Sequence, residues 1–244
     1  MAGPTAPPDR SRSLVGLLVA AFALAGLGIA GGSGIARALA PATTSPSFDG
    51  PPGACRIDDR LTPHRGPDDW ARTLLDPEYA LAPDDRPTDL VALSDHGVDG
   101  AGSLRAFVLP DLAAMANDAR AAGSAFRVSS AYRSYAAQAR TFASLEAGYG
   151  RDEALRSAAR PGHSEHQLGT TIDIARSEDA EAWLAENAWR YGFVMSYPPG
   201  HSPRTTCYKP EPWHFRYMGR DAARSVFASG LSLRAWLWNR QGDD

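Results

Sequence analysis

Lysine is nearly absent from this sequence of 244 residues, since Lys209 is the only one. The residue three positions before it is Thr206, so the chain contains no Ser-x-x-Lys motif. That absence excludes a serine peptidase of the penicillin-binding type. An excess of positive charge is missing as well, because the formal net charge is −3. The composition therefore gives no support for a nucleic-acid partner.

Charged residues are absent from one long apolar run near the N-terminus, Leu14–Ala36. As a helix, this run is long enough to cross about 30 Å of hydrocarbon. Arg10 and Arg12 precede it and suit a short cytoplasmic N-terminus at residues 1–13. We therefore expect a single-pass membrane anchor at residues 14–36, with the rest of the chain on the extracytoplasmic side of the cell membrane.

A cleaved signal peptide is the alternative interpretation of the same run. Ala38-Leu39-Ala40 has the small-x-small pattern of a cleavage site. Pro41 follows it directly and disfavours cleavage, which is why we prefer the anchor. With cleavage the protein would be secreted, and in both cases the remaining chain is exported.

A spacer separates the apolar run from the folded domain. Residues 37–53 are rich in Pro, Ser, Thr and Gly and contain almost no core-forming side chains. We expect them to form a flexible linker, followed by one globular domain at residues 54–240. The sequence shows no internal repeat, and we expect a monomer although no pattern fixes the oligomeric state.

Cysteine is scarce, with only Cys55 and Cys207 in the chain. An even pair in an exported protein favours a disulfide, because the compartment is oxidising. We therefore expect a disulfide that joins the start of the domain to the segment near residue 207. Two isolated thiols are the weaker alternative.

The periodicity of the domain predicts an α+β fold with a mainly antiparallel sheet and flanking helices, because helices and strands do not alternate regularly. Apolar residues at helical spacing, with Ser134 as an N-cap, predict helices. They lie at residues 111–122, 134–147, 152–159, 179–191 and 231–238. Apolar and β-branched residues in short runs predict strands at residues 126–131, 170–174 and 213–217.

The segment PGHSEHQLGTTIDIA (161–175) gathers polar side chains among small residues. A fully extended chain would separate His166 from Asp173 by up to about 25 Å, but Gly169 permits a sharp turn between them. On the strand that follows, Asp173 would lie on the face opposite two isoleucines. A buried carboxylate there needs a partner, which a cation would provide. A structural ion pair with an ordinary turn histidine fits these residues as well.

A second segment, EPWHFRY (211–217), adds another possible ligand, His214, and a carboxylate three residues before it. Pro212 lacks an N–H and bends the entry to the strand, so Glu211 need not follow strand alternation. Glu211 could then face a water beside a metal that His214 binds. An aromatic core strand that begins with an exposed glutamate is the alternative.

Three motifs together resemble the VanY-type D-alanyl-D-alanine carboxypeptidases, which are zinc peptidases of bacterial cell walls. The motifs are SAYRSY (130–135), PGHSEHQLGTTIDI (161–174) and EPWHFRYMG (211–219). The resemblance covers most of the chain from Cys55 to Gly219 and implies the α+β fold that these enzymes share with hedgehog domains. His163, Leu168 and Thr170 depart from the commonest pattern, which leaves fine specificity open.

The resemblance implies one Zn²⁺ per chain, held by His166, Asp173 and His214. It also implies that Glu211 is the general base and that Arg133 contacts the substrate or the oxyanion. Peptidoglycan stem peptides that end in D-alanyl-D-alanine would be the substrates.

Further substrate contacts follow from motif position alone. Arg133, Gln138 and Ser164 are the candidates for binding the terminal carboxylate, and Trp213 is a candidate pocket wall. Glu165 and His163 are expected in supporting or solvent-facing roles. An L,D-carboxypeptidase that acts on tetrapeptide stems, or a non-catalytic cell-wall-binding domain of the same fold, would share much of this pattern.

Overall fold

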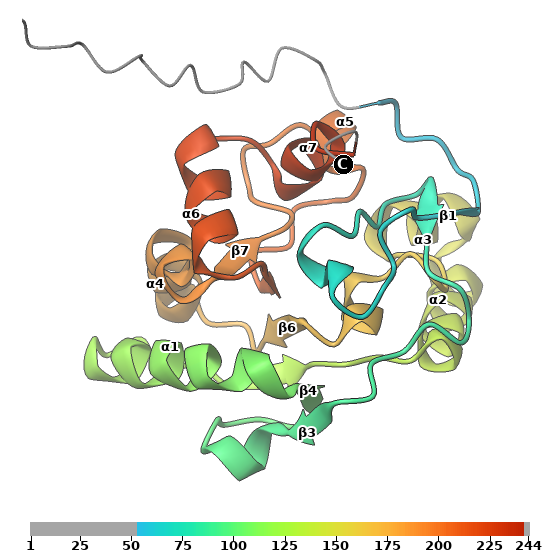
Figure 1. The fold of residues 1–244 in the computed structure, drawn as a ribbon. Helices are drawn as coiled ribbons and strands as arrows, with labels where there is room; N and C mark the ends of the chain where they lie inside the picture. The colour runs from blue at the N-terminus through green and yellow to red at the C-terminus, as the bar shows by residue number, and fades with distance from the viewer. Residues whose placement is uncertain (1–52, 242–244) are drawn as a thin grey trace, which may run out of the picture. The chain divides into compact units, whose positions relative to one another are not determined.

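The computed structural model describes residues 53–241, which form a domain of helices around a small central sheet (Figure 1). The strands are β1 (Arg60–Leu61), β2 (Tyr79–Ala80), β3 (Leu90–Ala92), β4 (Ser103–Arg105), β5 (Val128–Ser130), β6 (Thr171–Ile174), β7 (Phe193–Met195) and β8 (His214–Tyr217). The α-helices are α1 (Leu109–Ala121), α2 (Tyr135–Tyr149), α3 (Arg151–Ser157), α4 (Glu178–Asn187), α5 (Pro203–Thr206), α6 (Arg220–Ser229) and α7 (Leu233–Trp238). Short 3₁₀ helices are η1 (Asp69–Ala71), η2 (Leu93–His96), η3 (Ala106–Val108), η4 (Glu165–Leu168) and η5 (Ala188–Tyr191).

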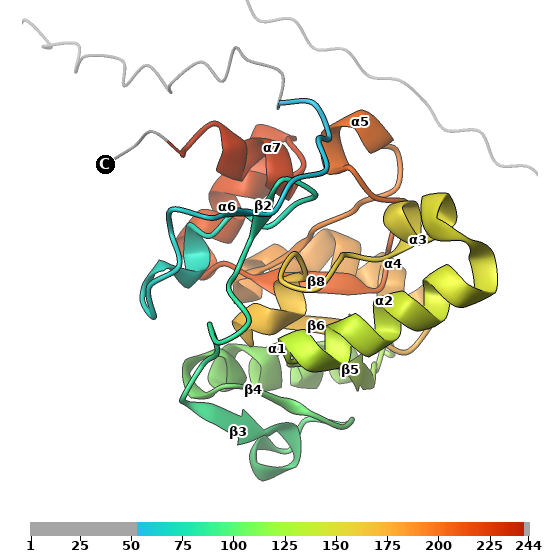
Figure 2. The ribbon, with the colours of Figure 1, turned by 90° about the vertical axis from the view of Figure 1, so that its right-hand side faces the viewer.

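The central sheet has the strand order β5-β6-β8-β7, and each neighbouring pair is antiparallel. Asp173 on β6 pairs directly with His214 on β8. The register therefore places side chains from two distant motifs opposite each other. An antiparallel pair β3–β4 (Figure 2) and a two-residue parallel pair β1–β2 lie outside this sheet. The predicted α+β fold with a mainly antiparallel sheet is confirmed.

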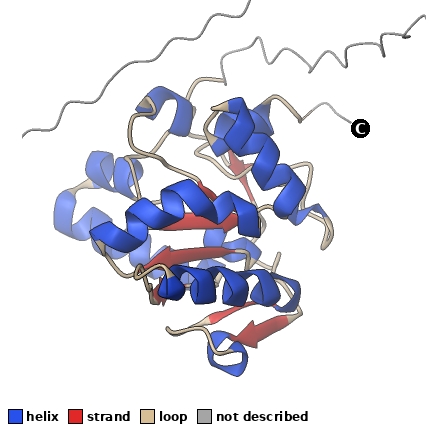
Figure 3. Cartoon of the chain, turned by 90° about the vertical axis from the view of Figure 1, so that its left-hand side faces the viewer, coloured by secondary structure: helices blue, strands red, loops and turns tan. Residues whose placement is uncertain are grey.

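Helices surround the strands of the central sheet (Figure 3). The larger apolar core lies between α1, the sheet and α4, and its members include Leu112, Met115, Ile172 and Ile174. The two isoleucines of β6 thus face the core, as strand alternation predicts. A second core gathers side chains of β7, α6 and α7, among them Val194, Val226 and Trp236.

All five predicted helices are present with boundaries shifted by one to several residues, and two of the differences have a clear physical cause. The helix predicted at residues 179–191 is two elements, α4 and η5, because the chain tightens into a 3₁₀ turn before Gly192. The helix predicted from residue 231 begins at Leu233, since the Ser232 side chain accepts the Ala235 N–H and caps it. Ser134 caps α2 in the same way, as predicted, by accepting the Ala137 N–H.

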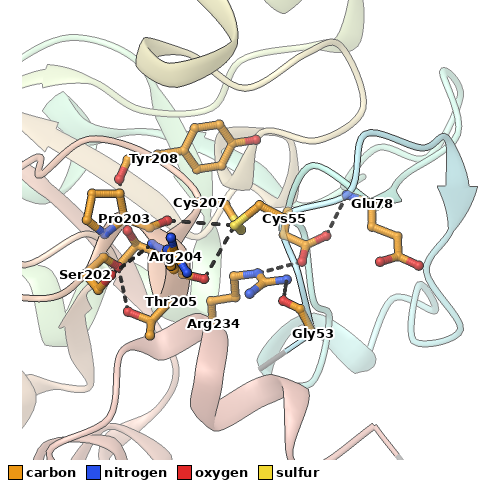
Figure 4. The surroundings of a disulfide bond; sticks show 12 residues. Gly53, Cys55, Glu78, Ser202, Pro203, Arg204, Thr205, Cys207, Tyr208 and Arg234 are labelled. Carbon is orange, nitrogen blue, oxygen red and sulfur yellow. Dashed lines mark hydrogen bonds and ion pairs between the residues drawn. A yellow bond between two sulfur atoms is a disulfide. The ribbon is translucent and has the colours of Figure 1, made fainter. Parts of the chain in front are cut away.

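The disulfide between Cys55 and Cys207 is present, with Cα atoms 5.5 Å apart, and confirms the predicted pairing (Figure 4). Between residues 53 and 241, none of the helices combines the length and the apolar character needed to cross a bilayer. The anchor predicted at residues 14–36 and nearly all of the predicted linker lie outside the described residues.

Candidate metal centre

Three elements bring the predicted metal ligands together. The turn η4 carries His166, β6 carries Asp173 and β8 carries His214. Gly169 ends η4 with φ +69°, so the chain reverses there and enters β6. One ligand atom from each of the three residues lies within 4.8 Å of the other two. Two imidazoles and a carboxylate are a common donor set of catalytic zinc sites, which keep a fourth position open.

Hydrogen bonds decide which imidazole nitrogens face the centre. His166 Nδ1 lies 2.7 Å from the Ala131 carbonyl, to which it donates, and its Nε2 lies 3.1 Å from Asp173 Oδ2. His214 is turned the other way. Its Nε2 lies 3.0 Å from Glu165 Oε2, and its Nδ1 lies 3.0 Å from Asp173 Oδ1. His166 Nε2 and His214 Nδ1 therefore converge on the Asp173 carboxylate, and each second nitrogen has a fixed acceptor, as metal-binding histidines require.

Glu165 and Arg216 form a buried ion pair behind this centre. Arg216 is fully buried, and its Nη1 donates to Glu165 Oε1 over 3.0 Å. Arg216 Nη2 donates to the carbonyls of Trp70 and Thr73, each at 2.7 Å. Ser196 Oγ donates to Glu165 Oε2 over 2.6 Å. Glu165 is therefore a supporting residue, and its predicted solvent-facing alternative is wrong because the side chain is buried.

The charge of Arg216 also keeps Glu165 ionised. Burial raises the pKa of the Glu165 carboxyl, but the Arg216 charge and the hydrogen bond from His214 outweigh burial and lower the pKa to about 2. An ionised carboxylate there accepts the His214 Nε2–H and leaves Nδ1 to face the centre. The pair thus fixes the orientation of a candidate ligand.

Glu211 lies beside the three candidate ligands. Its Oε2 is 3.6 Å from His214 Nδ1, and its backbone N–H donates to the Tyr197 carbonyl over 2.8 Å. Burial, which is the largest cause, and the charges of Asp173 and Glu165 together raise the pKa of Glu211 to about 7 against the opposing effect of His214. A carboxyl with a pKa near neutrality suits proton transfer in both directions.

Arg133 supplies the positive charge that faces the centre. Its Nη1 donates to Gln138 Oε1 over 2.9 Å, its Nη2 donates to Ser130 Oγ over 2.7 Å, and Nη2 lies 3.6 Å from Asp173 Oδ2. Gln138 also donates from Nε2 to the Ala159 carbonyl over 2.6 Å. Gln138 is therefore engaged in holding Arg133, and its predicted contact with substrate stays a prediction.

The remaining candidates line one cavity of about 210 Å³ that also contains the three ligands and Glu211. Ser164 and Trp213 are part of its wall, and the Arg176 guanidinium lies 4.5 Å from the Trp213 ring centroid. Tyr197 and Tyr208 line the cavity too, although no motif singled them out. A larger hollow of about 450 Å³ between α4, β7 and α6 is mainly apolar and contains none of the predicted site residues.

His163 lies outside this cavity and is fully buried. Its Nδ1 is 2.6 Å from the Asp76 carbonyl and its Nε2 is 3.1 Å from Asp59 Oδ1. His163 therefore joins the motif turn to the start of the domain and takes a supporting role.

Comparisons with known proteins agree with this geometry. The VanY profile of D-alanyl-D-alanine carboxypeptidases matches residues 102–220. A D-alanyl-D-alanine carboxypeptidase of Enterococcus faecalis is 41% identical over 91 residues, which are 35% of this chain and 34% of that protein. The match thus spans about a third of this curated relative.

Solved structures match over a larger share of the chain. The LdcB LD-carboxypeptidase is 28% identical with a TM-score of 0.65, over 76% of this chain and 92% of that one. A vancomycin-resistance D,D-pentapeptidase VanY mutant in complex with Zn(II) is 30% identical with a TM-score of 0.62, over 69% and 99% of the two chains. VanYB in complex with D-alanine-D-alanine is equally similar, at 30% identity and a TM-score of 0.62, over 69% and 97%.

Proposed function

Because this chain belongs to the VanY family of D-alanyl-D-alanine carboxypeptidases, we propose that it removes the terminal D-alanine from peptidoglycan stem peptides in a zinc-dependent reaction. One observation carries the proposal. His166 Nε2, His214 Nδ1 and the Asp173 carboxylate converge in a cavity that also holds Glu211 and Arg133. A non-catalytic wall-binding domain would not require Glu211 and Arg133 beside the three ligands.

His166, Asp173 and His214 would hold one Zn²⁺ per chain. When bound, the ion supplies a Lewis acid that polarises a carbonyl and lowers the pKa of water towards about 7. Glu211 accepts a proton from the attacking water at a carboxylate oxygen and donates it to the nitrogen of the leaving D-alanine.

Arg133 stabilises negative charge in this reaction. Ser130 and Gln138 fix its guanidinium, so the positive charge is in place before a substrate binds. The guanidinium would bind the carbonyl oxygen as it becomes an oxyanion, or the terminal carboxylate of the peptide. Gln138, Ser164 and Trp213 complete the wall around that position.

An L,D-carboxypeptidase is the second candidate, and the structural similarity to LdcB favours it. Muropeptides that end in D-Ala-D-Ala and muropeptides that end in a single D-Ala separate the two. Release of alanine from the first substrate alone supports the proposed D,D-activity, and release from the second alone supports the L,D-activity. Release from neither would contradict both and favour a wall-binding domain.

We also propose that the protein is attached to the cell membrane by residues 14–36 and acts outside the cytoplasm. The uncharged run after Arg10 and Arg12 supports this, as does the Cys55–Cys207 disulfide. Full-length protein should stay in the membrane fraction after a high-salt wash, and external protease should degrade the domain in spheroplasts. Recovery of a chain that begins at Pro41 from the medium would support signal cleavage instead.

A further inference from the structure

The segment between β7 and β8, residues 196–213, delivers four side chains to the catalytic cavity: Tyr197, Tyr208, Glu211 and Trp213. Apart from the single turn of α5 it has no regular structure. The Tyr208 ring packs edge-on against Tyr197, with centroids 5.3 Å apart. The position of the proposed base therefore depends on how this segment is held.

The disulfide holds this segment at a residue whose backbone conformation is unusual. Cys207 ends α5 with φ +66°, and among residues 53–241 it is the only non-glycine residue with positive φ. A β-carbon disfavours this conformation, which persists when the surroundings enforce it. Pro210 and Pro212 flank Glu211 and restrict the backbone that follows. A change of backbone at Cys207 would therefore displace Tyr208 and Glu211 together.

The other end of the disulfide is anchored independently. Arg234 Nη2 donates to the Gly53 carbonyl over 3.1 Å, and Arg160 donates to the Asp58 carbonyl and to Asp59 Oδ1, each over 2.5 Å. Figure 4 shows Arg234 and Gly53 beside the bond. Cys55 Sγ also lies 3.5 Å from the Arg204 carbonyl oxygen, which is a packing contact because a disulfide sulfur carries no hydrogen. The bond thus joins the anchored start of the described domain to the end of α5.

We propose that the Cys55–Cys207 disulfide positions the catalytic segment. It holds Cys207 in the left-handed conformation, which keeps Tyr208 against Tyr197 and the Glu211 carboxylate beside the metal ligands. Cys55 and Cys207 are positioning residues, and the inference rests on the proposed function. The enzyme would reach full turnover only after export to an oxidising compartment, although its metal site forms without the bond.

The metal site should not need the disulfide, because its ligands are held elsewhere. His166 is fixed by the Ala131 carbonyl, and Asp173 and His214 pair across β6 and β8. Glu165 accepts the His214 Nε2–H and is itself held by Arg216. None of these contacts involves the segment from α5 to Glu211.

Two double variants test the inference in the full chain. Both lose the covalent bond, but Cys55→Ser/Cys207→Gly accepts φ +66° without strain while Cys55→Ser/Cys207→Ser does not. We expect the serine variant to bind zinc as the wild type does, with kcat about 10²-fold lower and KM changed less than threefold. The glycine variant should recover at least about tenfold of that loss. A disulfide that only stabilises the fold would leave both variants with the same kcat.

Val226→Ala is the control for lost stability, since Val226 is buried in the second core, away from the cavity. It should lower the Tm and leave kcat unchanged. Equal kcat in the two double variants, or loss of zinc in both, would overturn the inference.

Hydrogen exchange gives a readout that does not need activity. The Lys209 N–H donates to the Arg156 carbonyl over 3.1 Å, and the Glu211 N–H donates to the Tyr197 carbonyl over 2.8 Å. Reduction and alkylation of the folded wild type should accelerate exchange in residues 203–214, since the His214 N–H donates to the Glu211 carbonyl, and leave residues 163–174 and 215–217 unchanged. Unchanged exchange in residues 203–214 would refute the positioning role. If the wild type releases no alanine, the proposed function fails, while this measurement still decides the inference.

Discussion

The Glu165 carboxylate shows how one buried charge organises the centre. It is buried and accepts hydrogen bonds from His214, Arg216 and Ser196. Removing one member of such a group leaves the others with unpaired polar atoms, which costs more free energy than the lost contact itself. The orientation of His214 therefore depends on the charge of a residue that does not touch the metal position.

Glu165→Gln should weaken zinc binding about 10- to 100-fold, because His214 loses a charged acceptor. The same change should lower the free energy of unfolding by about 3–5 kcal/mol, since the Arg216 charge stays buried without its partner. Ser196→Ala is the matched control: it keeps the carboxylate and should cost only about 1–3 kcal/mol. Zinc titration and urea unfolding measure both effects. Equal zinc affinity in wild type and Glu165→Gln would contradict this role.

The pH dependence of stability follows from the same residue. The pKa of Glu165 is lowered from 4.5 to about 2, so the folded state binds fewer protons than the unfolded state between these values. The carboxylate therefore stabilises the fold above pH 4.5, and that stabilisation is lost as the pH falls towards 2. In metal-free protein, the difference in unfolding free energy between wild type and Glu165→Gln should shrink from pH 6 to pH 3. A constant difference would contradict the assignment.

At the scale of elements, the turn between η4 and β6 determines whether His166 and Asp173 lie close together. Gly169 has φ +69°, and a Cβ there would lie 3.0 Å from the side chains of both Leu90 and Pro87. The position thus disfavours a side chain for two reasons, backbone strain and close contact with these neighbours. Gly123 has a similar φ of +78°, but a Cβ there would meet no atom within 4 Å.

Gly169→Ala should therefore destabilise the protein more than Gly123→Ala. Gly123→Ala should lower the free energy of unfolding by about 1–2 kcal/mol, the cost of the left-handed backbone conformation for a residue with a β-carbon. Gly169→Ala should also weaken zinc binding, because His166 and Asp173 lie on either side of the turn. Gly123→Ala should leave zinc binding unchanged. Thermal unfolding and zinc titration of the two variants provide the comparison, and equal effects would show that the turn does not set the ligand geometry.

Sequence patterns revealed most of the central sheet and the residues that meet in the cavity. Helical and strand periodicity located β6 and β8, and the motifs pointed to His166, Asp173 and His214, whose binding of zinc stays a prediction. The role of Arg216 was missed because its other acceptors are the carbonyls of Trp70 and Thr73. Residues 70–73 have no periodic pattern, so their contact with Arg216 on β8 depends on tertiary packing. The available signal was Arg216 itself, a charged residue two positions after His214 and therefore on the same face of a buried strand.

At the scale of the whole molecule, the disulfide joins residues that are 152 positions apart. In the chain-entropy model, closing a loop of this length contributes about 5 kcal/mol to stability. The oxidised domain should therefore unfold at a higher denaturant concentration than Cys55→Ser/Cys207→Ser, with a stability difference of several kcal/mol. Denaturant unfolding of both forms measures it. A difference below about 1 kcal/mol would mean that the unfolded state gains little freedom without the bond.

Zinc-dependent hydrolysis with Glu211 as the base is the central claim. The direct test removes metal from the purified protein with a chelator and follows D-alanine release from a muropeptide that ends in D-Ala-D-Ala. Release should stop on removal and return with one equivalent of Zn²⁺ per chain. Glu211→Ala should bind the same equivalent and release D-alanine about 10²- to 10⁴-fold more slowly. Undiminished release from metal-free wild type, or from zinc-loaded Glu211→Ala, would contradict the claim.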